Sequence, residues 1–207
     1  MTSELLQLHT PVSTELQTPF GGFTVSVPPG EPGLSDRTCV ALHRGPLDQP
    51  GPLVRIHSAC LFSETFSSMD CDCADQLRSS MELIAREGRG VIVYQYQEGR
   101  GQGLEAKIRG MAVMDRQNLT TAGAYASLGL AADVREYEAP LALLDVLGVH
   151  RSVRVMTRNP RKLAALARAG YEVREVVALD YPMTPRVRAY VASKQSELGH
   201  LPDQPRT

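Results

Sequence analysis

The chain has 207 residues, 43% of them hydrophobic and 22% charged, and a formal net charge of −1. This composition suits one compact domain with its own core, and the near-zero charge excludes a general basic surface for nucleic acid. Tryptophan is absent and aromatic residues make up 5%, so we expect no base-stacking platform for single strands. The N-terminal residues do not resemble a signal peptide and no apolar run has membrane-spanning length, which predicts a cytoplasmic protein without membrane partners.

The first half of the chain reads as strands followed by a helix. Short β-branched segments bounded by proline and glycine predict strands over 23–27, 38–43, 53–59 and 91–96, with loops over 28–33 and 45–52. Leu77, Met81 and Ile84 recur at helical spacing before Gly88, which predicts a helix over 74–87. A glycine-rich loop over 98–103 then leads into a helix over 104–116.

The second half alternates helices and strands. We predict helices over 139–147 and 158–170, the latter with Pro160 in its first turn and Gly170 just past its end, and strands over 152–157 and 171–179. The order favours an α/β (α+β) fold, a mixed β-sheet flanked by helices in a single domain over residues 1–207. The polar tail from Leu198 carries two prolines, so we expect it to fray, with residues 202–207 disordered.

The segment 57-HSACLFSETFSSMDCDC-73 holds three of the four cysteines. Cys71 and Cys73 can hardly form a disulfide across one residue, and cytosolic thiols stay reduced. Thiolates are the soft ligands that select zinc. Together with Cys60 from a neighbouring strand, this pair therefore predicts a zinc site.

Whether that zinc is structural or catalytic depends on a fourth ligand. His57 is the obvious choice, but His57 and Cys60 are expected in one strand, where positions i and i+3 face opposite sides. Cys39 is an alternative without local support. Three protein ligands leave a place for a water whose pKa falls to about 7. Since C-x-C is not a common structural spacing, we favour a catalytic zinc, and the structural reading stays open.

Two further segments suit phosphate. The loop 98-EGRGQGL-104 resembles a phosphate cradle, although a plain turn would look similar; Glu98 could accept two N–H groups from a purine edge and Arg100 could bind an oxyanion. The turn 157-TRNPRK-162 opens a predicted helix, whose N-terminus favours anions, but simple capping is the alternative. Asp133 and Arg135, close together in 131-AADVREY-137, would by themselves indicate surface charge.

Together these segments resemble the GTP cyclohydrolase II family, zinc enzymes that open the guanine ring at the entry to riboflavin synthesis. The resemblance rests on Cys60 spaced ten residues from 71-CDC-73, followed in order by 98-EGRGQGL-104, 107-KIR-109, 128-LGLAADVREY-137 and 157-TRNPRK-162. It extends from 18-TPFGGF-23 to 197-ELGHL-201. From its length we expect the chain to lack the fused dihydroxybutanone-phosphate synthase domain of some relatives.

The resemblance implies roles for individual residues. Cys60, Cys71 and Cys73 match the zinc ligands, Asp133 the general base, and Arg135 the residue assigned to attack the α-phosphate. A guanidinium pKa exceeds about 12, so we give Arg135 an electrostatic role, oriented by Asp133. The resemblance also implies Zn²⁺, one ion per chain, Mg²⁺ with the triphosphate, and a homodimer. The positions that match GTP-holding residues are Arg55, Ile56, His57, Ser58, Ala59, Gln76, Glu98, Gly99, Arg100, Thr121, Thr157 and Lys162.

The chain departs from the family pattern at two places. Met111 in 107-KIRGM-111 stands where the family has a catalytic tyrosine in K-I-R-A-Y, and a thioether cannot relay a proton. Ala59 in 57-HSAC-60 replaces a glutamate. Our hypothesis is that ring opening survives while deformylation is impaired, so the product is either the diamino pyrimidine nucleotide with formate or the formylamino intermediate. A paralogue acting on another purine nucleotide and a non-catalytic nucleotide-binding protein with structural zinc remain alternatives.

Overall fold

A central mixed sheet organises the protein. The computed structural model describes residues 10–28 and 39–202, which form a seven-stranded sheet in the order β1-β2-β3-β5-β4-β6-β7. Strands β1, β2, β3 and β5 pair antiparallel, whereas β4 pairs parallel with β5 and β6, and β6 pairs parallel with β7. The predicted α/β class with a mixed sheet is confirmed. The strands are β1 Val12–Thr18, β2 Gly21–Val27, β3 Cys39–Arg44, β4 Leu53–Ser58, β5 Gly90–Gln95, β6 Ser152–Val155 and β7 Glu172–Val176.

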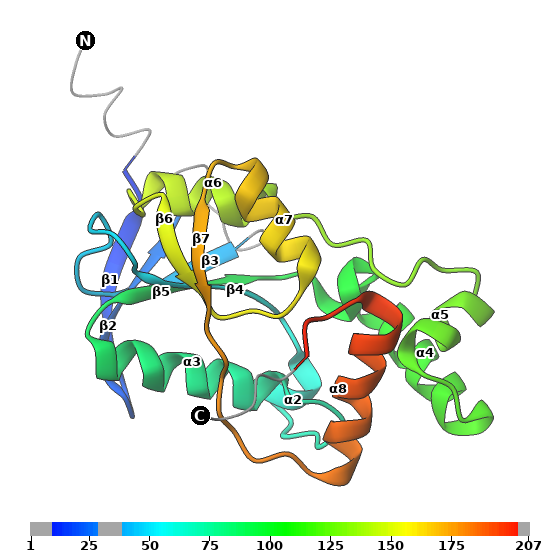
Figure 1. Cartoon of the computed structure of the whole chain (residues 1–207). Coiled ribbons are helices and arrows are strands. Elements are labelled where there is room, and N and C mark those ends of the chain that lie inside the picture. The colour runs from blue at the N-terminus through cyan, green and yellow to red at the C-terminus, as the bar shows by residue number, and fades with distance from the viewer. Residues whose placement is uncertain (1–9, 29–38, 203–207) are drawn as a thin grey trace.

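Helices cover both faces of this sheet (Figure 1). Helix α3 lies on one face and α6 and α7 lie on the other, while α4, α5 and α8 stand beyond the end of the central strands. No helix in residues 10–28 and 39–202 is long and apolar enough to cross a membrane. The helical segments are α2 Leu61–Glu64, α3 Cys73–Glu87, the 3-10 helix η2 Glu98–Gly101, α4 Gly103–Gln117, α5 Thr121–Ser127, α6 Glu138–Val146, α7 Pro160–Arg168 and α8 Pro185–Leu198.

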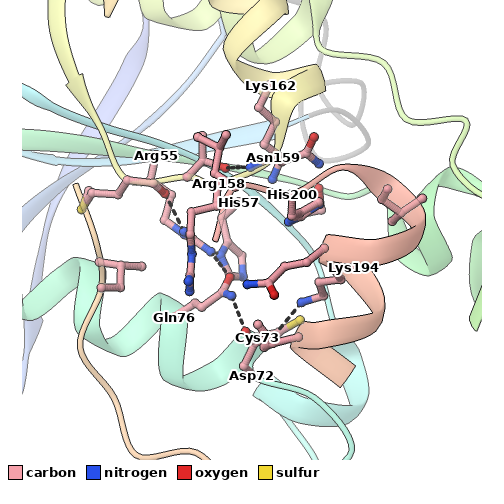
Figure 2. A pocket seen from close by; sticks show the side chains of 18 of the residues that line it. Arg55, His57, Asp72, Cys73, Gln76, Arg158, Asn159, Lys162, Lys194 and His200 are labelled. Atoms are coloured by element: carbon pink, nitrogen blue, oxygen red, sulfur yellow. Dashed lines mark hydrogen bonds and ion pairs between the residues drawn. The ribbon is translucent and has the colours of Figure 1, made fainter. Parts of the chain in front are cut away.

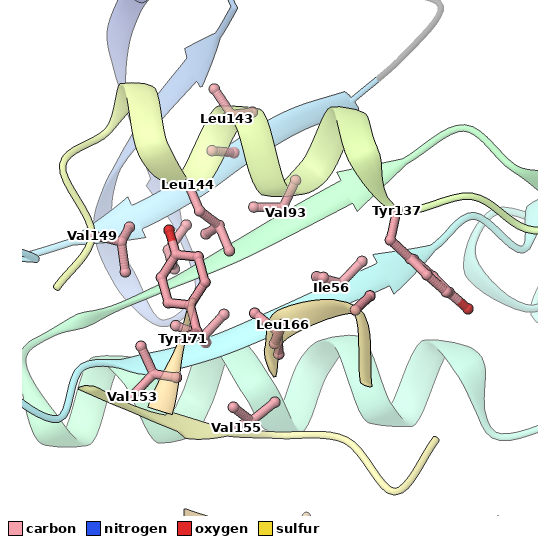
Figure 3. Packing of buried hydrophobic residues seen from close by; sticks show 14 of the residues in the cluster. Ile56, Val93, Tyr137, Leu143, Leu144, Val149, Val153, Val155, Leu166 and Tyr171 are labelled. Carbon is pink, nitrogen blue, oxygen red and sulfur yellow. The ribbon is translucent and has the colours of Figure 1, made fainter. Parts of the chain in front are cut away.

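The central strand β4 separates two hydrophobic clusters. Its alternate residues Val54 and Ile56 pack with Leu143, Leu144 and other residues under α6 and α7 (Figure 3). On the opposite face, a smaller cluster joins Leu53 of β4 to residues of β2, β5 and α3. Both faces of β4 are covered, as expected of a parallel strand, so the polar side chains that share the α3 face with Leu53 are buried as well.

The connections on the two sides of β4 diverge at the carboxyl end of this strand. From β4 the chain passes through α3 to β5 on one side, and it later returns through α6 to β6 on the other side. In open α/β sheets, such a reversal opens a crevice outside the carboxyl ends of the strands. Ser58, at the end of β4, lies at this point.

The predicted elements largely match the observed ones. The four predicted helices correspond to α3, α4, α6 and α7, and the predicted strands to β2, β3, β4, β5, β6 and β7, with ends shifted by a few residues. The predicted loop over 45–52 joins β3 to β4. Residue 38 and residues 29–33 of the predicted loop over 28–33 lie outside the described residues.

Some elements escaped prediction. Strand β1 is almost wholly exposed, so it lacks an apolar side; its pairing with β2 stabilises it. Helix α5 contains a glycine, and α2 is a single turn. The expectation of a fraying tail from Leu198 is wrong for 198–201, because His200 N donates to Lys194 O at 3.2 Å and Leu201 N donates to Arg158 O at 2.9 Å. Residues 203–207 are outside the described ranges.

Candidate active site

Three cysteine side chains meet just beyond the end of β4. Cys60 is the N-cap of α2, Cys71 lies in the turn before α3, and Cys73 is the first residue of α3. Their sulfur atoms lie within 4.8 Å of one another, and the Sγ atoms of Cys60 and Cys71 are 3.6 Å apart. Tetrahedral zinc with Zn–S bonds of about 2.3 Å separates its sulfurs by about 3.8 Å. The thiol set therefore fits a zinc ion.

His57 does not join this group. Strand β4 ends at Ser58, so the prediction that Cys60 lies in a strand with His57 is wrong. The His57 ring is engaged elsewhere: Nδ1 accepts from Arg55 Nε at 3.0 Å, and Nε2 donates to Glu64 Oε1 at 2.8 Å. Among the residues that the structure describes, the metal-binding group consists of the three thiols alone, without Cys39.

The surroundings of Cys60 favour its thiolate, whereas hydrogen bonds with Cys60 raise the pKa of Cys71 and of Cys73. Hydrogen bonds from Cys71 and Cys73 lower the pKa of Cys60, and the positive charge of Lys107 acts in the same direction. Lys107 Nζ lies 3.2 Å from Cys60 Sγ and donates to Glu98 Oε1 at 2.8 Å. A metal ligand must be a thiolate, so these contacts prepare Cys60 for that role.

The glycine-rich segment forms a tight turn, η2, whose two central residues are not in a right-handed helical conformation. Gly99 and Arg100 both have left-handed backbone conformations, with φ of 59° and 58°. The Glu98 carboxylate, expected to be available to a purine, accepts instead from Gly99 N at 2.9 Å, from Leu61 N at 2.8 Å and from Lys107. Within the described residues, the buried Nη2 of Arg100 has no hydrogen-bond partner. A buried guanidinium with a spare donor makes Arg100 a candidate for binding an anion.

Two cavities adjoin the thiols. The larger, of about 400 Å³, is lined by the three cysteines, by Met111 and by residues of α4, α5 and α8. The smaller, of about 120 Å³, lies at the carboxyl ends of β4 and β6 (Figure 2). The residues that line both are Ser58, Cys73, Arg100, Arg135 and Tyr190. All three thiols thus line the larger cavity, and Cys73 lines the smaller one as well.

The smaller cavity is strongly cationic. Its described lining contains one carboxylate, Asp72, against six arginine and lysine side chains: Arg55, Arg100, Arg135, Arg158, Lys162 and Lys194. Lys162 is buried and donates to Ile56 O at 2.7 Å. Its pKa is far below the ordinary lysine value, first because of burial and then because of Arg135 and Arg55. Bound phosphate groups would relieve this concentration of positive charge.

The helix start at 157–162 also has the geometry of a capped helix N-terminus. Asn159 Oδ1 accepts from Arg161 N at 2.9 Å, and Thr157 Oγ1 accepts from Asn159 N at 3.2 Å. The two interpretations are therefore compatible, because Thr157, Asn159 and Lys162 line the cationic cavity as well.

Asp133 and Arg135 form a buried ion pair. Arg135 Nε donates to Asp133 Oδ1 at 3.0 Å, and Arg161 Nη1 lies 2.8 Å from the same oxygen. Burial alone would raise the pKa of Asp133, but the hydrogen bonds and charge of Arg135 outweigh it and lower that pKa. Arg135 lines both cavities, whereas Asp133 lines neither.

The remaining predicted residues divide between the two cavities. Ile56 lines neither and contributes its carbonyl to Lys162. The sequence patterns did not single out Arg161, Tyr181, Lys194 and His200. Arg161 could have been found, because it precedes Lys162 in the segment 157-TRNPRK-162. The smaller cavity receives Arg55, His57, Gln76, Thr157 and Lys162, and the larger receives Ala59, Glu98, Gly99 and Thr121, while Ser58 and Arg100 line both.

A three-thiol group able to hold a metal ion, beside a cationic cavity and at a reversal of a mixed α/β sheet, suits a metal-dependent enzyme that acts on an anion. The family model of GTP cyclohydrolase II matches residues 9–178. The chain belongs to the GTP cyclohydrolase II family and is a hydrolase of that type.

Curated relatives match over most of the chain. A GTP cyclohydrolase-2 from Pseudomonas fluorescens (strain SBW25) is 42% identical over 190 residues, covering 91% of this chain and 91% of the relative. A GTP cyclohydrolase-2 from Hahella chejuensis is 43% identical over 194 residues, covering 91% and 90%. A solved two-domain 3,4-dihydroxy-2-butanone 4-phosphate synthase from A. baumannii gives a TM-score of 0.43 at 16% identity, and the match spans 83% of this chain and 40% of that protein.

Proposed function

We propose that the protein hydrolyses GTP, opening the imidazole ring of guanine at C8 and releasing pyrophosphate, as an enzyme of riboflavin synthesis in the cytoplasm. The observation that carries this proposal is the position of the three thiols in the wall of the larger cavity, with Cys73 also lining the cationic cavity beside it. The names of the relatives support the same substrate.

In this proposal the purine lies in the larger cavity and the triphosphate in the smaller. A cavity of about 400 Å³ is within the usual range for small-molecule sites. The cationic lining of the smaller cavity and the spare Nη2 of Arg100 suit phosphate oxygens. Mg²⁺ bound to the triphosphate would neutralise the negative charge that the cationic side chains do not balance.

Cys60, Cys71 and Cys73 would hold the zinc ion, which when bound supplies a Lewis acid and lowers the pKa of water to about 7. Water adds at C8 and the C8–N9 bond breaks, which leaves a formyl group on the former ring nitrogen. A second water releases that group as formate, and a third cleaves the α–β phosphate bond. Lys107, fixed by Glu98, offsets the thiolate charge beside the reacting ring.

Arg135 would act on the phosphate side. Its guanidinium is held by Asp133 and reaches both cavities. Preorganised positive charge of this kind stabilises negative charge that develops during phosphate-bond cleavage. Asp133 is engaged by two guanidinium groups, so we propose that it orients Arg135 instead of removing a proton.

The product depends on the residue at position 111. Met111 lines the cavity that holds the thiols, where the family pattern has a phenol. Tyr125 lines the same cavity, but its hydroxyl donates to Gly99 O at 3.0 Å and its side chain is buried. We therefore propose that ring opening proceeds and that formate release is slowed, so the formylamino pyrimidine nucleotide accumulates.

Mass spectrometry of the product from GTP, with zinc-loaded protein and Mg²⁺, tests both the ring opening and the slowed release of formate. An intact guanine ring in the presence of stoichiometric zinc overturns the proposed activity. Formate and pyrophosphate in equal yield would support the activity and reject the slowed deformylation.

A second candidate is hydrolysis of another purine nucleotide. Ala59 lines the larger cavity beside Cys60, where the family has a glutamate, so the contacts available to the base differ. Rates with GTP, dGTP, 8-oxo-GTP and ATP distinguish the candidates, and a preference for GTP rejects this one. The third alternative, a closed structural zinc, requires a fourth protein ligand, and the group within the described chain offers three. We also propose a homodimer, following the family resemblance.

A further inference from the structure

The residue between the two neighbouring zinc ligands is held by a dense set of hydrogen bonds. The side chain of Asp72 is 1% exposed. Its Oδ1 accepts from Lys194 Nζ at 2.8 Å, and its Oδ2 accepts from Gln76 Nε2 at 2.6 Å and from Tyr181 OH at 2.9 Å. Figure 2 shows Lys194 and Gln76 approaching Asp72 from different helices, next to Cys73.

Two of these donors come from the far end of the chain. Tyr181 follows β7 and Lys194 lies on α8, at separations of 109 and 122 residues from Asp72. The match to the family model stops at residue 178, before either of them. The stretch after β7 therefore adds contacts to the turn that presents Cys71 and Cys73.

This stretch is itself fixed on the protein. Thr184 caps α8, and Val187 and Val191 are buried beneath it. Ser79 Oγ donates to Asp180 O at 2.9 Å, one residue before Tyr181. At the other end, the Leu201 bond to Arg158 ties the chain to the segment between β6 and α7. Tyr181 and Lys194 thus reach Asp72 from an anchored segment.

We propose that Tyr181 and Lys194 are positioning residues for the metal site, which act through Asp72. A buried carboxylate needs compensating charge and hydrogen bonds. If a donor is lost, Asp72 must turn toward water, and the backbone that carries Cys71 and Cys73 moves with it. Partners that orient metal ligands typically affect metal affinity by about 10- to 100-fold.

Lys194 also lines the cationic cavity, so a direct contact with phosphate is the competing role. The distance of 2.8 Å to Asp72 and the 14% exposure of the Lys194 side chain favour the positioning role. Tyr181 supports the same conclusion independently, because its hydroxyl reaches the other oxygen of Asp72. The two roles predict different measurements, since a phosphate contact has no effect on zinc affinity without nucleotide.

The test uses the full chain and measures zinc affinity without nucleotide, by competition with a chromophoric chelator under reducing conditions. The variants are Tyr181→Phe, Lys194→Gln and Lys194→Arg, with Arg188→Gln as the matched control, because Arg188 is an exposed cation on the same helix. We expect zinc to bind about tenfold or more weakly in Lys194→Gln and to a smaller extent in Tyr181→Phe. Lys194→Arg should retain most of the affinity, and Arg188→Gln should match the unchanged protein.

Visible spectra of the cobalt-substituted proteins give a second readout, because cobalt–thiolate bands report ligand geometry. Altered bands in Tyr181→Phe and Lys194→Gln support the proposal. Unchanged zinc affinity and cobalt spectra in both variants overturn it, including the case in which Lys194→Gln only raises KM for GTP. If Lys194→Gln does not fold, Tyr181→Phe decides, since it removes one hydroxyl.

The proposal rests on the zinc site of the proposed function, but the two can fail separately. Zinc affinity is read without GTP. Suppose that the unchanged protein binds zinc, that the variants bind zinc more weakly as expected, and that the guanine ring nevertheless stays intact. This result would reject the proposed activity and support the role of Tyr181 and Lys194.

Discussion

Gly110 lies directly against the ring of Tyr125. A Cβ atom at position 110 would stand 2.7 Å from Tyr125 Cε1, closer than real carbon contacts allow. Tyr125 in turn donates its hydroxyl to Gly99 O, in the turn that carries Glu98 and Arg100. The missing side chain on α4 therefore makes room for a buried ring that supports the glycine-rich segment.

We expect Gly110→Ala to destabilise the protein by about 1–3 kcal/mol, because added volume in a packed site forces the ring to shift. Urea denaturation measures this change. Gly123→Ala is the control: Gly123 is also helical, but a Cβ there meets its nearest neighbour at an acceptable 3.4 Å. Equal stability of the Gly110 variant and the unchanged protein would contradict the expectation.

Replacing a thiol of the metal group should release zinc. Cys71→Ser exchanges a soft ligand for a weak one, so we expect less than one zinc per chain after dialysis, by elemental analysis, with loss of ring opening. Cys39→Ala, a replacement of the buried cysteine outside the group, should keep full zinc content. Full zinc content in Cys71→Ser would exclude Cys71 as a ligand.

Restoring the phenol should change the product. In Met111→Tyr, we expect the yield of formate relative to pyrophosphate to rise several-fold, because a hydroxyl again faces the thiols and can relay a proton. Met114→Tyr is the matched control, since Met114 lines the same cavity from the same helix. A ratio that stays constant in Met111→Tyr, or rises equally in both variants, would count against the role of position 111.

Arg161 should affect the rate of pyrophosphate release because it positions Asp133 and Arg135. It donates to Asp133 O at 2.8 Å and to Arg135 O at 3.0 Å, and it pairs with the Asp133 carboxylate. Displacement of catalytic groups by about 1 Å can cost about 100-fold in rate, so we expect Arg161→Gln to lower kcat for pyrophosphate release by about tenfold or more.

The control for Arg161 is Arg168→Gln, an exposed position at the end of the same helix. KM for GTP should change less than kcat, because Arg161 lines neither cavity. An effect confined to KM would instead indicate a binding role.

His200 should make the fold sensitive to acid. Burial, followed by the charges of Lys194, Arg135, Lys162 and Arg100, lowers its pKa from 6.5 to about 3. The folded state therefore keeps His200 neutral, whereas the unfolded state takes up a proton as the pH falls below 6.5. The stability contributed by neutral His200 is fully present above this value and declines as the pH falls toward about 3.

When the pH falls from about 7.5 to about 5, the free energy of unfolding should decrease by about 1 kcal/mol less in His200→Gln than in the unchanged protein. This figure allows for the partial exposure of the ring. Urea unfolding at the two pH values measures the difference. Identical pH dependence in the two proteins would show that His200 titrates normally in the folded state.

Local patterns predicted much of the fold. Leu77, Met81 and Ile84 mark the buried side of α3, and Gly88 ends it in a left-handed conformation, as its position implies. Strand β1 carries no such signal, because its stability comes from pairing. Helix α8 did have local signals, namely the Thr184 cap and Pro185 in its first turn, but its apolar residues are few.

The site was predictable where its residues are close in sequence. The grouping of Cys60 with Cys71 and Cys73 follows from spacing and soft-ligand chemistry. By contrast, the contacts of Tyr181 and Lys194 with Asp72 join residues more than one hundred positions apart. No periodicity or motif encodes such a contact, because the folding of the intervening chain creates it.

The late position of Lys194 has a consequence for biosynthesis. The thiols leave the ribosome before Lys194 does, and 122 residues separate Asp72 from it. At translation rates of about 5–20 residues per second, the interval is about 6–24 seconds. During that time the nascent chain exposes three reduced cysteines without their distal support, and oxidants or competing metal ions have their best access to them.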